Sequence, residues 1–378
     1  MTNPEPANHL HFPALDGLRA LAFILVFAQH YHLLPWGWTG VDVFFVLSGF
    51  LITGILFDTR DRQHRVRNFY IRRTLRIFPL YYGLMLMLVV VYPILRWRWN
   101  WGFLLWPAYL GNFCRGIYPY KYGSPLEMLA DFQLVSATHR ATLYLGHFWS
   151  LCVEEQFYLI WPWVVFWVRD RKKLLYICLA CIVACLAMRI IGKHTLPQFM
   201  LDQEVLYRWT PFRVDALLIG GFIALVRRGP SPRRLLVAAR IGFGMLFSAL
   251  LLWFLFNPYA RHGPVGYTYP VWSFTWGLTF VDMFSACLVV MALERDSITS
   301  RILGVRPLRW IGQISYGAYV FHDILHDKFS QVIGSLCIRH ATAATAALGL
   351  AFTLLTAWAS FRLFEMRFIR LKDQWTRS

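Results

Sequence analysis

Ten apolar runs, separated by short polar or basic stretches, dominate this sequence of 378 residues. An α-helix rises about 1.5 Å per residue, so about 20 apolar residues cross the roughly 30 Å hydrocarbon core of a bilayer. The pattern therefore predicts an all-α, polytopic transmembrane bundle of about ten helices, forming one domain over residues 1–378. The runs lie near residues 15–34, 41–57, 77–95, 147–168, 174–192, 213–226, 235–256, 271–293, 311–333 and 341–361.

The composition supports a membrane protein and excludes a soluble one. Hydrophobic residues make up 57% of the chain, charged residues only 15%, and there are 17 Trp and 31 Phe. The net charge of +18 would suit a nucleic-acid partner, but the basic residues form short clusters between apolar runs. That arrangement is typical of loops beside a lipid bilayer, so we expect no nucleic-acid partner. The seven Cys lie mostly inside apolar runs, which predicts packing and neither disulfides nor a metal site.

The basic residues also predict the orientation of the chain. An even number of helices places both termini on one side, and 26 of the 38 Lys and Arg residues fall on that side. By the positive-inside rule both termini are cytoplasmic, in the cell inner (plasma) membrane. This gives cytoplasmic tails at 1–14 and 362–378, a basic cytoplasmic loop at 58–76 and an extracytoplasmic loop at 95–146. Within that loop, Trp101 to Phe113 is too short to span, so we interpret it as either interfacial or re-entrant.

Two ionisable side chains, Arg19 and His30, lie in the first apolar run. On a helix their offset corresponds to roughly 16 Å, and it places them within about 20° of the same face. Ionisable groups at membrane depth are costly, so they are functional candidates by default. His30 suits a general base near neutral pH. The alternative is a packing histidine bonded to a carbonyl or to water.

Acidic residues follow in the second and fourth runs. Asp42 is a candidate for orienting His30 or a substrate hydroxyl, although an interfacial cap explains it equally well. In the segment that opens the fourth run, Glu154, Tyr158 and Trp161 share a helix face, whereas Glu155 points about 100° away. We expect one acid to face a cavity and the other its rim. A structural ion pair with an Arg is the alternative.

Two arginines at the start of the third run have the spacing of an anion site. Arg73 and Arg76 are three residues apart, so both guanidinium groups lie on one helix face. Two adjacent guanidinium groups suit a phosphate or pyrophosphate. The alternative is that they only follow the positive-inside rule. In the ninth run, His322 lies at a depth that suits the same cavity as His30.

Together these segments resemble the acyltransferase 3 family of integral-membrane acyltransferases. The resemblance rests on Leu15 to Arg19 with His30, Gly40 to Ile52, Arg72 to Pro79, Trp149 to Pro162 and, more weakly, Ile314 to His322. It implies ten helices, cytoplasmic termini and transfer of an acyl group, often acetyl from acetyl-CoA, to a hydroxyl of a carbohydrate or small acceptor. In the family the His is the presumed base, and the Arg-x-x-Arg pair acts near the cytoplasmic face.

Two departures from the family pattern bear on the acceptor. Cys152 replaces a small Ser or Ala, which we expect to be tolerated. Some members add a soluble extracytoplasmic esterase-like domain, which is not part of these 378 residues. We therefore expect the acceptor to be acylated by the membrane domain itself or through a separate partner.

The sequence thus predicts a membrane O-acyltransferase that uses acyl-CoA as a co-substrate and has no tightly bound cofactor. The donor's phosphates would bind Arg73, Arg76 and Arg19, while His30 deprotonates the acceptor with Glu154 or Asp42 orienting it. Tyr158, Trp161 and His322 are the expected substrate contacts. We expect Arg19 and His30 to line one continuous cavity, with Glu154 within about one water of His30.

Two other classes of protein compete with this interpretation. One is a proton-coupled transporter or flippase of a glycan or lipid precursor, with His30 and Glu154 as its proton relay. We see neither an inverted repeat nor a matching pair of broken helices, which such transporters usually have. The other is a structural partner without catalysis, which leaves the buried ionisable groups unexplained.

Overall fold

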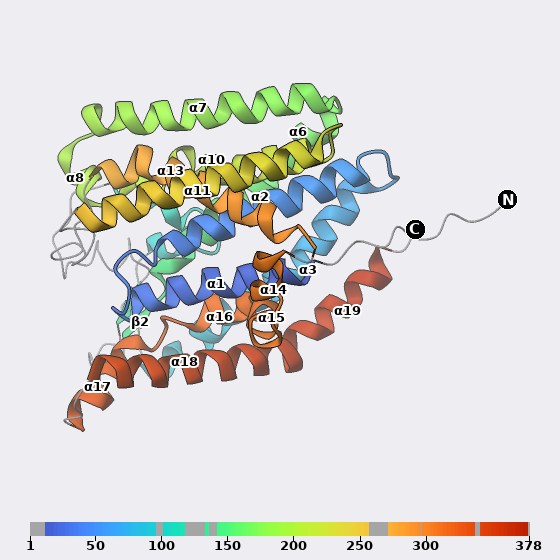
Figure 1. Ribbon diagram of the computed structural model, residues 1–378. Helices are drawn as coiled ribbons and strands as arrows, with labels where there is room; N and C mark the ends of the chain where they lie inside the picture. The colour runs from blue at the N-terminus through green and yellow to red at the C-terminus, as the bar shows by residue number, and fades with distance from the viewer. Residues whose placement is uncertain are drawn as a thin grey trace.

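The computed structural model describes residues 12–95, 101–117, 133–135, 142–256, 271–295, 297–336 and 341–376. Figure 1 shows a bundle of long helices that run roughly along one direction, with α7 along one side and α18 along the other. In these described residues the only strands are β1 (Gln133–Val135) and β2 (Thr142–Tyr144), which pair antiparallel. The predicted all-α class is therefore confirmed.

Nine long helices correspond to nine of the predicted apolar runs. They are α1 (Pro13–His30), α2 (Thr39–Thr59), α3 (Arg65–Val90), α6 (Trp149–Val168), α7 (Arg171–Thr195), α10 (Val214–Arg227), α11 (Pro232–Phe256), α13 (Trp276–Ala292) and α18 (Ala341–Ser360). Short elements connect them: α4 (Tyr92–Leu95), η1 (Trp101–Leu105), η2 (Gly111–Phe113), η3 (Gly146–Phe148), α8 (Gln198–Asp202), α9 (Val205–Arg208), η4 (Thr210–Phe212), η6 (Val271–Phe274) and α14 (Ile298–Leu303).

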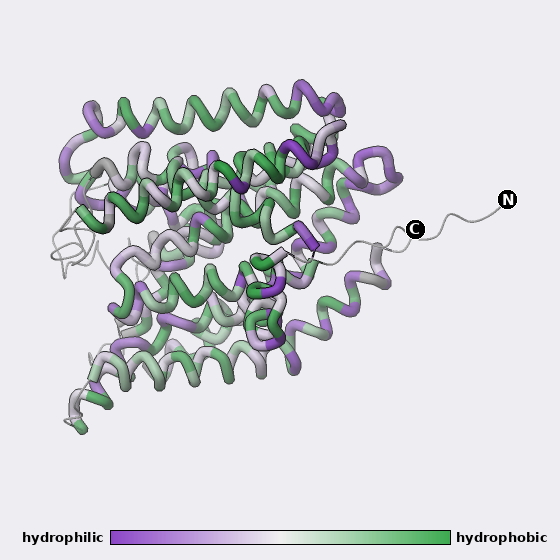
Figure 2. The backbone as a smooth tube through the Cα atoms, viewed as in Figure 1, coloured by the Kyte–Doolittle hydropathy of each residue, from purple (hydrophilic) through white to green (hydrophobic). Residues whose placement is uncertain are grey.

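Five helical segments in the described residues are long and apolar enough to cross a membrane: Thr39–Thr59, Arg65–Ile94, Arg171–Thr195, Pro232–Trp253 and Ala341–Lys372. Helices α7 and α11 are largely apolar in Figure 2, and large apolar side chains on them, such as Ile191 and Met245, are exposed. Such exposed apolar faces suit contact with lipid tails. The chain is thus a multi-pass membrane protein, while the count of about ten spanning helices and the cytoplasmic termini stay predictions.

The ninth run does not form the single helix that its length predicts. Residues 311–333 instead belong to three short helices, α15 (Arg306–Gln313), α16 (Ser315–Phe321) and α17 (His326–Ser335). At Gly312, a Cβ atom would stand 1.9 Å from the Asp16 carbonyl oxygen, so α15 touches the backbone of α1. The second break, at residues 322–325, brings polar side chains inward. An unbroken helix over residues 311–333 would allow neither the contact of Gly312 with α1 nor this inward placement of the polar side chains.

The predicted basic loop and the predicted C-terminal tail are largely helical. Helix α3 begins at Arg65, well before its apolar run, so most of loop 58–76 is helix. After α18 the chain makes a π-helical turn, η7 (Phe361–Glu365), and continues as α19 (Met366–Trp375). Figure 1 places the beginning of α1 and the end of α19 toward the same end of the bundle.

The piece from Trp101 to Phe113 folds back along α3. The Tyr81 hydroxyl donates to the Trp106 carbonyl oxygen at 2.6 Å, and the Tyr82 hydroxyl donates to the Pro107 carbonyl oxygen at 2.9 Å. Both tyrosines precede the end of α3 by about two turns. The piece therefore packs against the side of α3, about two turns before that helix ends.

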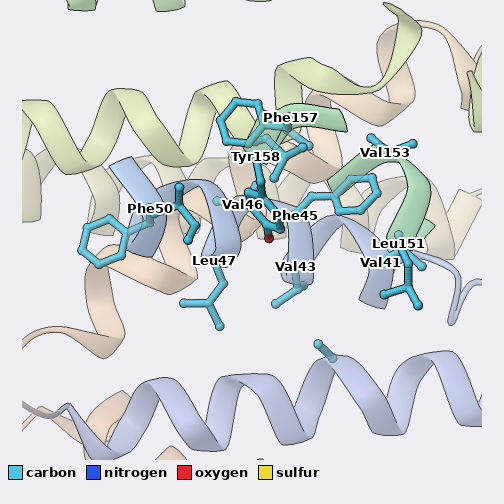
Figure 3. Packing of buried hydrophobic residues seen from close by; sticks show 14 of the residues in the cluster. Val41, Val43, Phe45, Val46, Leu47, Phe50, Leu151, Val153, Phe157 and Tyr158 are labelled. Atoms are coloured by element: carbon cyan, nitrogen blue, oxygen red, sulfur yellow. The ribbon is translucent and has the colours of Figure 1, made fainter. Parts of the chain in front are cut away.

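Close packing around α2 fixes the walls of the site. A Cβ atom on Gly49 would stand 1.8 Å from the Leu217 carbonyl oxygen, so α2 and α10 touch through their backbones. Phe45, Val46 and Phe50 of α2 belong to the same core as side chains of α6, such as Phe157 (Figure 3). This contact places the polar residues of α2 and α6 at fixed positions.

Candidate active site

A cavity of about 110 Å³ lies between α1, α2, α3, α6 and α16. Four of these elements, α1, α2, α3 and α6, come from the first four apolar runs, and α16 comes from the ninth. A cavity of this size holds a few waters or one phosphate-sized group, but not a whole nucleotide-bearing molecule. Its charged and hydroxyl-bearing lining includes Arg19, Arg73, Arg76, Ser150, Glu154 and Tyr319.

Three guanidinium groups line this cavity, as the sequence predicts for an anion site. Arg19 donates to the Asp16 carboxylate at 2.9 Å, which fixes its position nearly two turns after the start of α1. The Arg73 guanidinium lies over the Tyr158 ring, 3.8 Å from its centroid, and its Nε is 3.9 Å from Glu155 Oε1. Arg76 is exposed, so the cavity can be reached from this side.

The two adjacent acids take different positions, as their helical spacing predicts. Glu154 lines the cavity, whereas Glu155 lies beside Arg73 and does not belong to the lining. Tyr158 donates to the Ser48 hydroxyl at 2.9 Å, and Glu154 lies within hydrogen-bonding reach of both hydroxyls. The excess of cations over carboxylates in the lining leaves the cavity suited to an anionic ligand.

A second polar centre lies at the other end of α1. His30, the last residue of that helix, meets His147 before α6 and His322 at the end of α16. The His30 and His322 ring centroids are 4.7 Å apart, and those of His147 and His322 are 4.6 Å apart. The Asp323 carboxylate completes the centre, with Oδ2 3.8 Å from His30 Nε2 and 3.9 Å from His147 Nδ1.

Hydrogen bonds in this centre determine which nitrogen of His30 is available. His30 Nδ1 donates to the Val26 carbonyl oxygen at 2.9 Å, so in the neutral ring Nε2 carries the lone pair. His322 Nδ1 donates likewise to the Tyr319 carbonyl oxygen at 2.7 Å. The free nitrogen of His30 therefore faces Asp323, which stabilises the ring once it accepts a proton.

Exposure distinguishes the three histidines. The His30 side chain is 30% exposed and that of Asp323 is 15% exposed, whereas His147 and His322 are buried. Only the His30 ring can thus meet a substrate without rearrangement of the cluster. In the described part of the chain, no group of three or more His, Cys, Asp or Glu side chains is arranged to hold a metal ion.

The two centres are separate in this structure. The lining of the arginine cavity includes Arg19 and Glu154 but not His30, so the single continuous cavity that we expected is not present. Tyr319 lies between the centres, because it lines the cavity and its hydroxyl donates to the His147 carbonyl oxygen at 2.9 Å. The hydroxyl of Ser150 also bonds to that of Tyr319. Joining the centres therefore requires displacement of the Tyr319 side chain.

The remaining predicted residues have structural partners. Asp42 is fully buried and accepts a hydrogen bond from Arg213 at 2.7 Å, so the structure does not bring it to His30. Trp161 is buried and donates to the Thr53 hydroxyl at 2.8 Å, away from the cavity lining. The Tyr158 ring packs against the Arg73 guanidinium. His322 lies beside His30, as its predicted depth suggests.

Sequence reasoning missed Asp323 and His147. Both were hidden by the expectation of uninterrupted helices, since a straight helix through residue 323 gives no reason to turn that side chain toward His30. The signal that was available is the adjacent pair His322 and Asp323 within an otherwise apolar run. Two consecutive ionisable residues at that depth indicate a break in the helix.

Comparison with known proteins agrees with the motifs. The acyltransferase 3 family model, described as an acyltransferase domain, matches residues 12–362. The chain belongs to the acyltransferase 3 family. This confirms the family predicted from the sequence motifs and identifies the domain as an acyltransferase domain.

The relatives of this domain are larger proteins. The chain is 32% identical, over 94% of its length, to peptidoglycan O-acetyltransferase OatA of Listeria monocytogenes, of which the match covers 55%. It is 30% identical over 83% of its length to the putative peptidoglycan O-acetyltransferase YrhL of Bacillus subtilis, covering 48% of that protein. It is 25% identical over 82% of its length to O-acetyltransferase OatA of Staphylococcus aureus, covering 50%. The chain spans about half the length of these curated relatives. No solved structure matches it.

Proposed function

We propose that this domain is an O-acetyltransferase of the inner (plasma) membrane. It moves an acetyl group from acetyl-CoA, on the cytoplasmic side, to a hydroxyl of a cell-envelope carbohydrate on the other side. The names of its relatives in Listeria and Bacillus, peptidoglycan O-acetyltransferases, support a cell-wall glycan as the acceptor. The excess of basic residues toward the end that carries Arg76 supports a cytoplasmic donor.

One observation carries this proposal: the two polar centres lie at opposite ends of one helix face. Arg19 and His30 are 11 residues apart on α1, which corresponds to roughly 16 Å. An acyl donor with phosphates at one end and a thioester at the other end of a long arm needs such a separation. The arginine cavity would hold one phosphate group of the donor, and the histidine centre would receive the acyl end.

On the donor side, the arginines bind the donor and take no part in the transfer step. Arg73 is held by the Tyr158 ring and by Glu155, so its planar group keeps a fixed orientation. Fixed guanidinium forks bind phosphate oxygens in pairs, which an ammonium group does not reproduce. Arg76 is exposed and would meet the donor first as it enters.

On the acceptor side, His30 is the general base. Its Nε2 accepts the hydroxyl proton as the acceptor oxygen attacks the thioester carbonyl carbon. Asp323 stabilises the imidazolium that forms. Collapse of the tetrahedral intermediate expels the CoA thiolate, which takes the proton from His30, so the ring returns to its neutral form. Displacement of Tyr319 would let the acyl end of the donor pass from the cavity to His30.

Reconstitution of the purified protein into vesicles tests this proposal. Vesicles loaded with isotopically labelled acetyl-CoA receive a peptidoglycan-derived glycan outside, and mass spectrometry measures labelled O-acetyl groups. We expect label on the glycan with wild-type protein and at least about 100-fold less with His30→Ala. His64→Ala, at an exposed position before α3, is the matched control and should behave as wild type. Equal labelling by wild type and His30→Ala would refute the proposal.

A further inference from the structure

Five fully buried charged side chains form a layer inside the bundle, behind the arginine cavity. Arg189 on α7 donates two hydrogen bonds to the Asp215 carboxylate on α10, at 2.9 and 2.6 Å. Arg213 on α10 donates to Asp42 Oδ1 on α2 at 2.7 Å. Asp282 on α13 is the fifth member, and none of the five has any exposed surface.

Asp282 differs from the other two acids because no donor reaches it. Both of its carboxylate oxygens are buried without a hydrogen-bond partner, and so are Asp42 Oδ2 and the Nε and Nη1 atoms of Arg213. The Asp42 carboxyl lies within hydrogen-bonding reach of Asp282. Two carboxyl groups thus face each other, with unsatisfied oxygens on both sides. An unsatisfied buried polar group is rare and needs an explanation.

The other charged groups near Asp282 leave its oxygens without a hydrogen-bond partner. The charges of Asp215, Arg213 and Arg189 also interact with that of Asp282, and all three residues belong to the layer. On the helices packed against α13, the charged groups outside the layer pair with other partners or face solvent. Examples are Asp16 with Arg19 on α1, Arg240 on α11 with Glu294, and the exposed Arg301 on α14, while the Tyr207 hydroxyl faces Asp42 and Arg213.

The number of charges in the layer determines the protonation state of Asp282. Three ionised carboxylates against two guanidinium groups would leave one uncompensated negative charge in the protein interior. Burying such a charge costs several kcal/mol even after relaxation, and two adjacent carboxylates cannot both ionise cheaply. A single proton removes the excess charge and supplies a donor between the two carboxyl groups, because a neutral carboxylic acid donates one hydrogen bond.

We propose that the Asp42–Asp282 pair is a proton-binding site, in which the Asp282 carboxylic acid donates to Asp42 Oδ2. The bound proton makes the layer neutral and joins α13 to α2. It also braces the wall of the cavity, because Arg213 packs on the rings of Phe45 and Trp149 and Phe45 lines the cavity. Loss of the proton would place the excess negative charge between α2 and α13 and separate them. This inference does not depend on the acyl donor or acceptor.

Infrared spectroscopy of the purified protein in vesicles at neutral pH tests the proposal directly. A protonated carboxyl group has a carbonyl stretch that an ionised carboxylate lacks. We expect wild type to show this band and Asp282→Asn to show it with an area smaller by one carboxyl group. Asp58→Asn is the matched control, since the half-exposed Asp58 pairs with Arg228 and lies outside the layer. A band that is absent from wild type, or unchanged in Asp282→Asn, would overturn the proposal.

Stability against pH gives a second measurement that does not depend on the infrared band. The folded chain binds one proton that the unfolded carboxyl groups release at neutral pH, so its stability falls as pH rises. Unfolding in mixed SDS micelles should show the unfolding equilibrium constant of wild type rising tenfold per pH unit more steeply than that of Asp282→Asn. The Asn side chain keeps the donor to Asp42, so this variant should fold, whereas Asp282→Ala should be less stable. Equal pH slopes, or stabilisation of wild type alone by sodium ions, would show that no proton is bound there.

Discussion

Asp323→Asn is the most informative single change at the histidine centre, because it removes a charge and keeps the shape of the side chain. His30 Nε2 and Asp323 Oδ2 are 3.8 Å apart. At that distance a full pair of charges interacts by about 4 kcal/mol at an effective dielectric constant of 20, and by about 1 kcal/mol in bulk water. Both side chains are partly exposed, so we take about 2 kcal/mol as the loss of imidazolium stabilisation.

That loss corresponds to a fall of about 30-fold in acetyl transfer. The assay measures transfer of labelled acetyl groups to the glycan across a range of pH. Asp323→Asn makes the protonated His30 ring less stable, so the acidic limb of the pH–rate profile should move to lower pH. A purely structural role for Asp323 would lower the rate without moving that limb. Asp202→Asn, at the exposed end of α8, is the control. Transfer within threefold of wild type with an unchanged profile would refute the assigned role of Asp323.

Three further predictions concern the donor site and the fold. Arg76→Ala should weaken binding of acetyl-CoA to the purified protein by about tenfold or more, whereas Arg72→Ala, outside the cavity lining, should not; equal affinities in a calorimetric titration would argue against the donor site. Gly49→Ala should prevent native packing, because its Cβ would meet the backbone of α10 at 1.8 Å. Gly244→Ala is the control, because its Cβ would enter open space, and thermal unfolding in detergent compares the two variants. Trp161→Phe should cost about 1 kcal/mol of stability through one lost hydrogen bond and leave transfer intact; a large loss of transfer would place this ring in the site.

The apolar runs predicted most helices well because length and hydropathy are local properties. For example, the run at 41–57 became Thr39–Thr59, and the run at 147–168 became Trp149–Val168. The run at 311–333 failed because its breaks depend on neighbours distant in sequence. One is the contact of Gly312 with the α1 backbone, and the other is the pairing of Asp323 with His30.

The candidate site was predictable only where residues share one helix. The spacing of Arg73 and Arg76 placed both in the cavity lining, and the spacing of the two adjacent acids placed Glu154 there without Glu155. Asp42 was assigned to the wrong neighbour, because its partner Arg213 lies 171 residues away. Contacts of that kind depend on helix packing, which hydropathy and local spacing do not specify.

The central claim is that donor binding and proton abstraction occur at separate centres on α1. Measuring acetyl-CoA affinity and acetyl transfer on the same preparation of His30→Ala tests it most directly. We predict unchanged affinity for acetyl-CoA together with a loss of transfer of at least about 100-fold, because the base is missing and the arginine cavity is intact. Near-normal transfer by a well-folded His30→Ala protein, or a parallel loss of acetyl-CoA affinity, would contradict the claim.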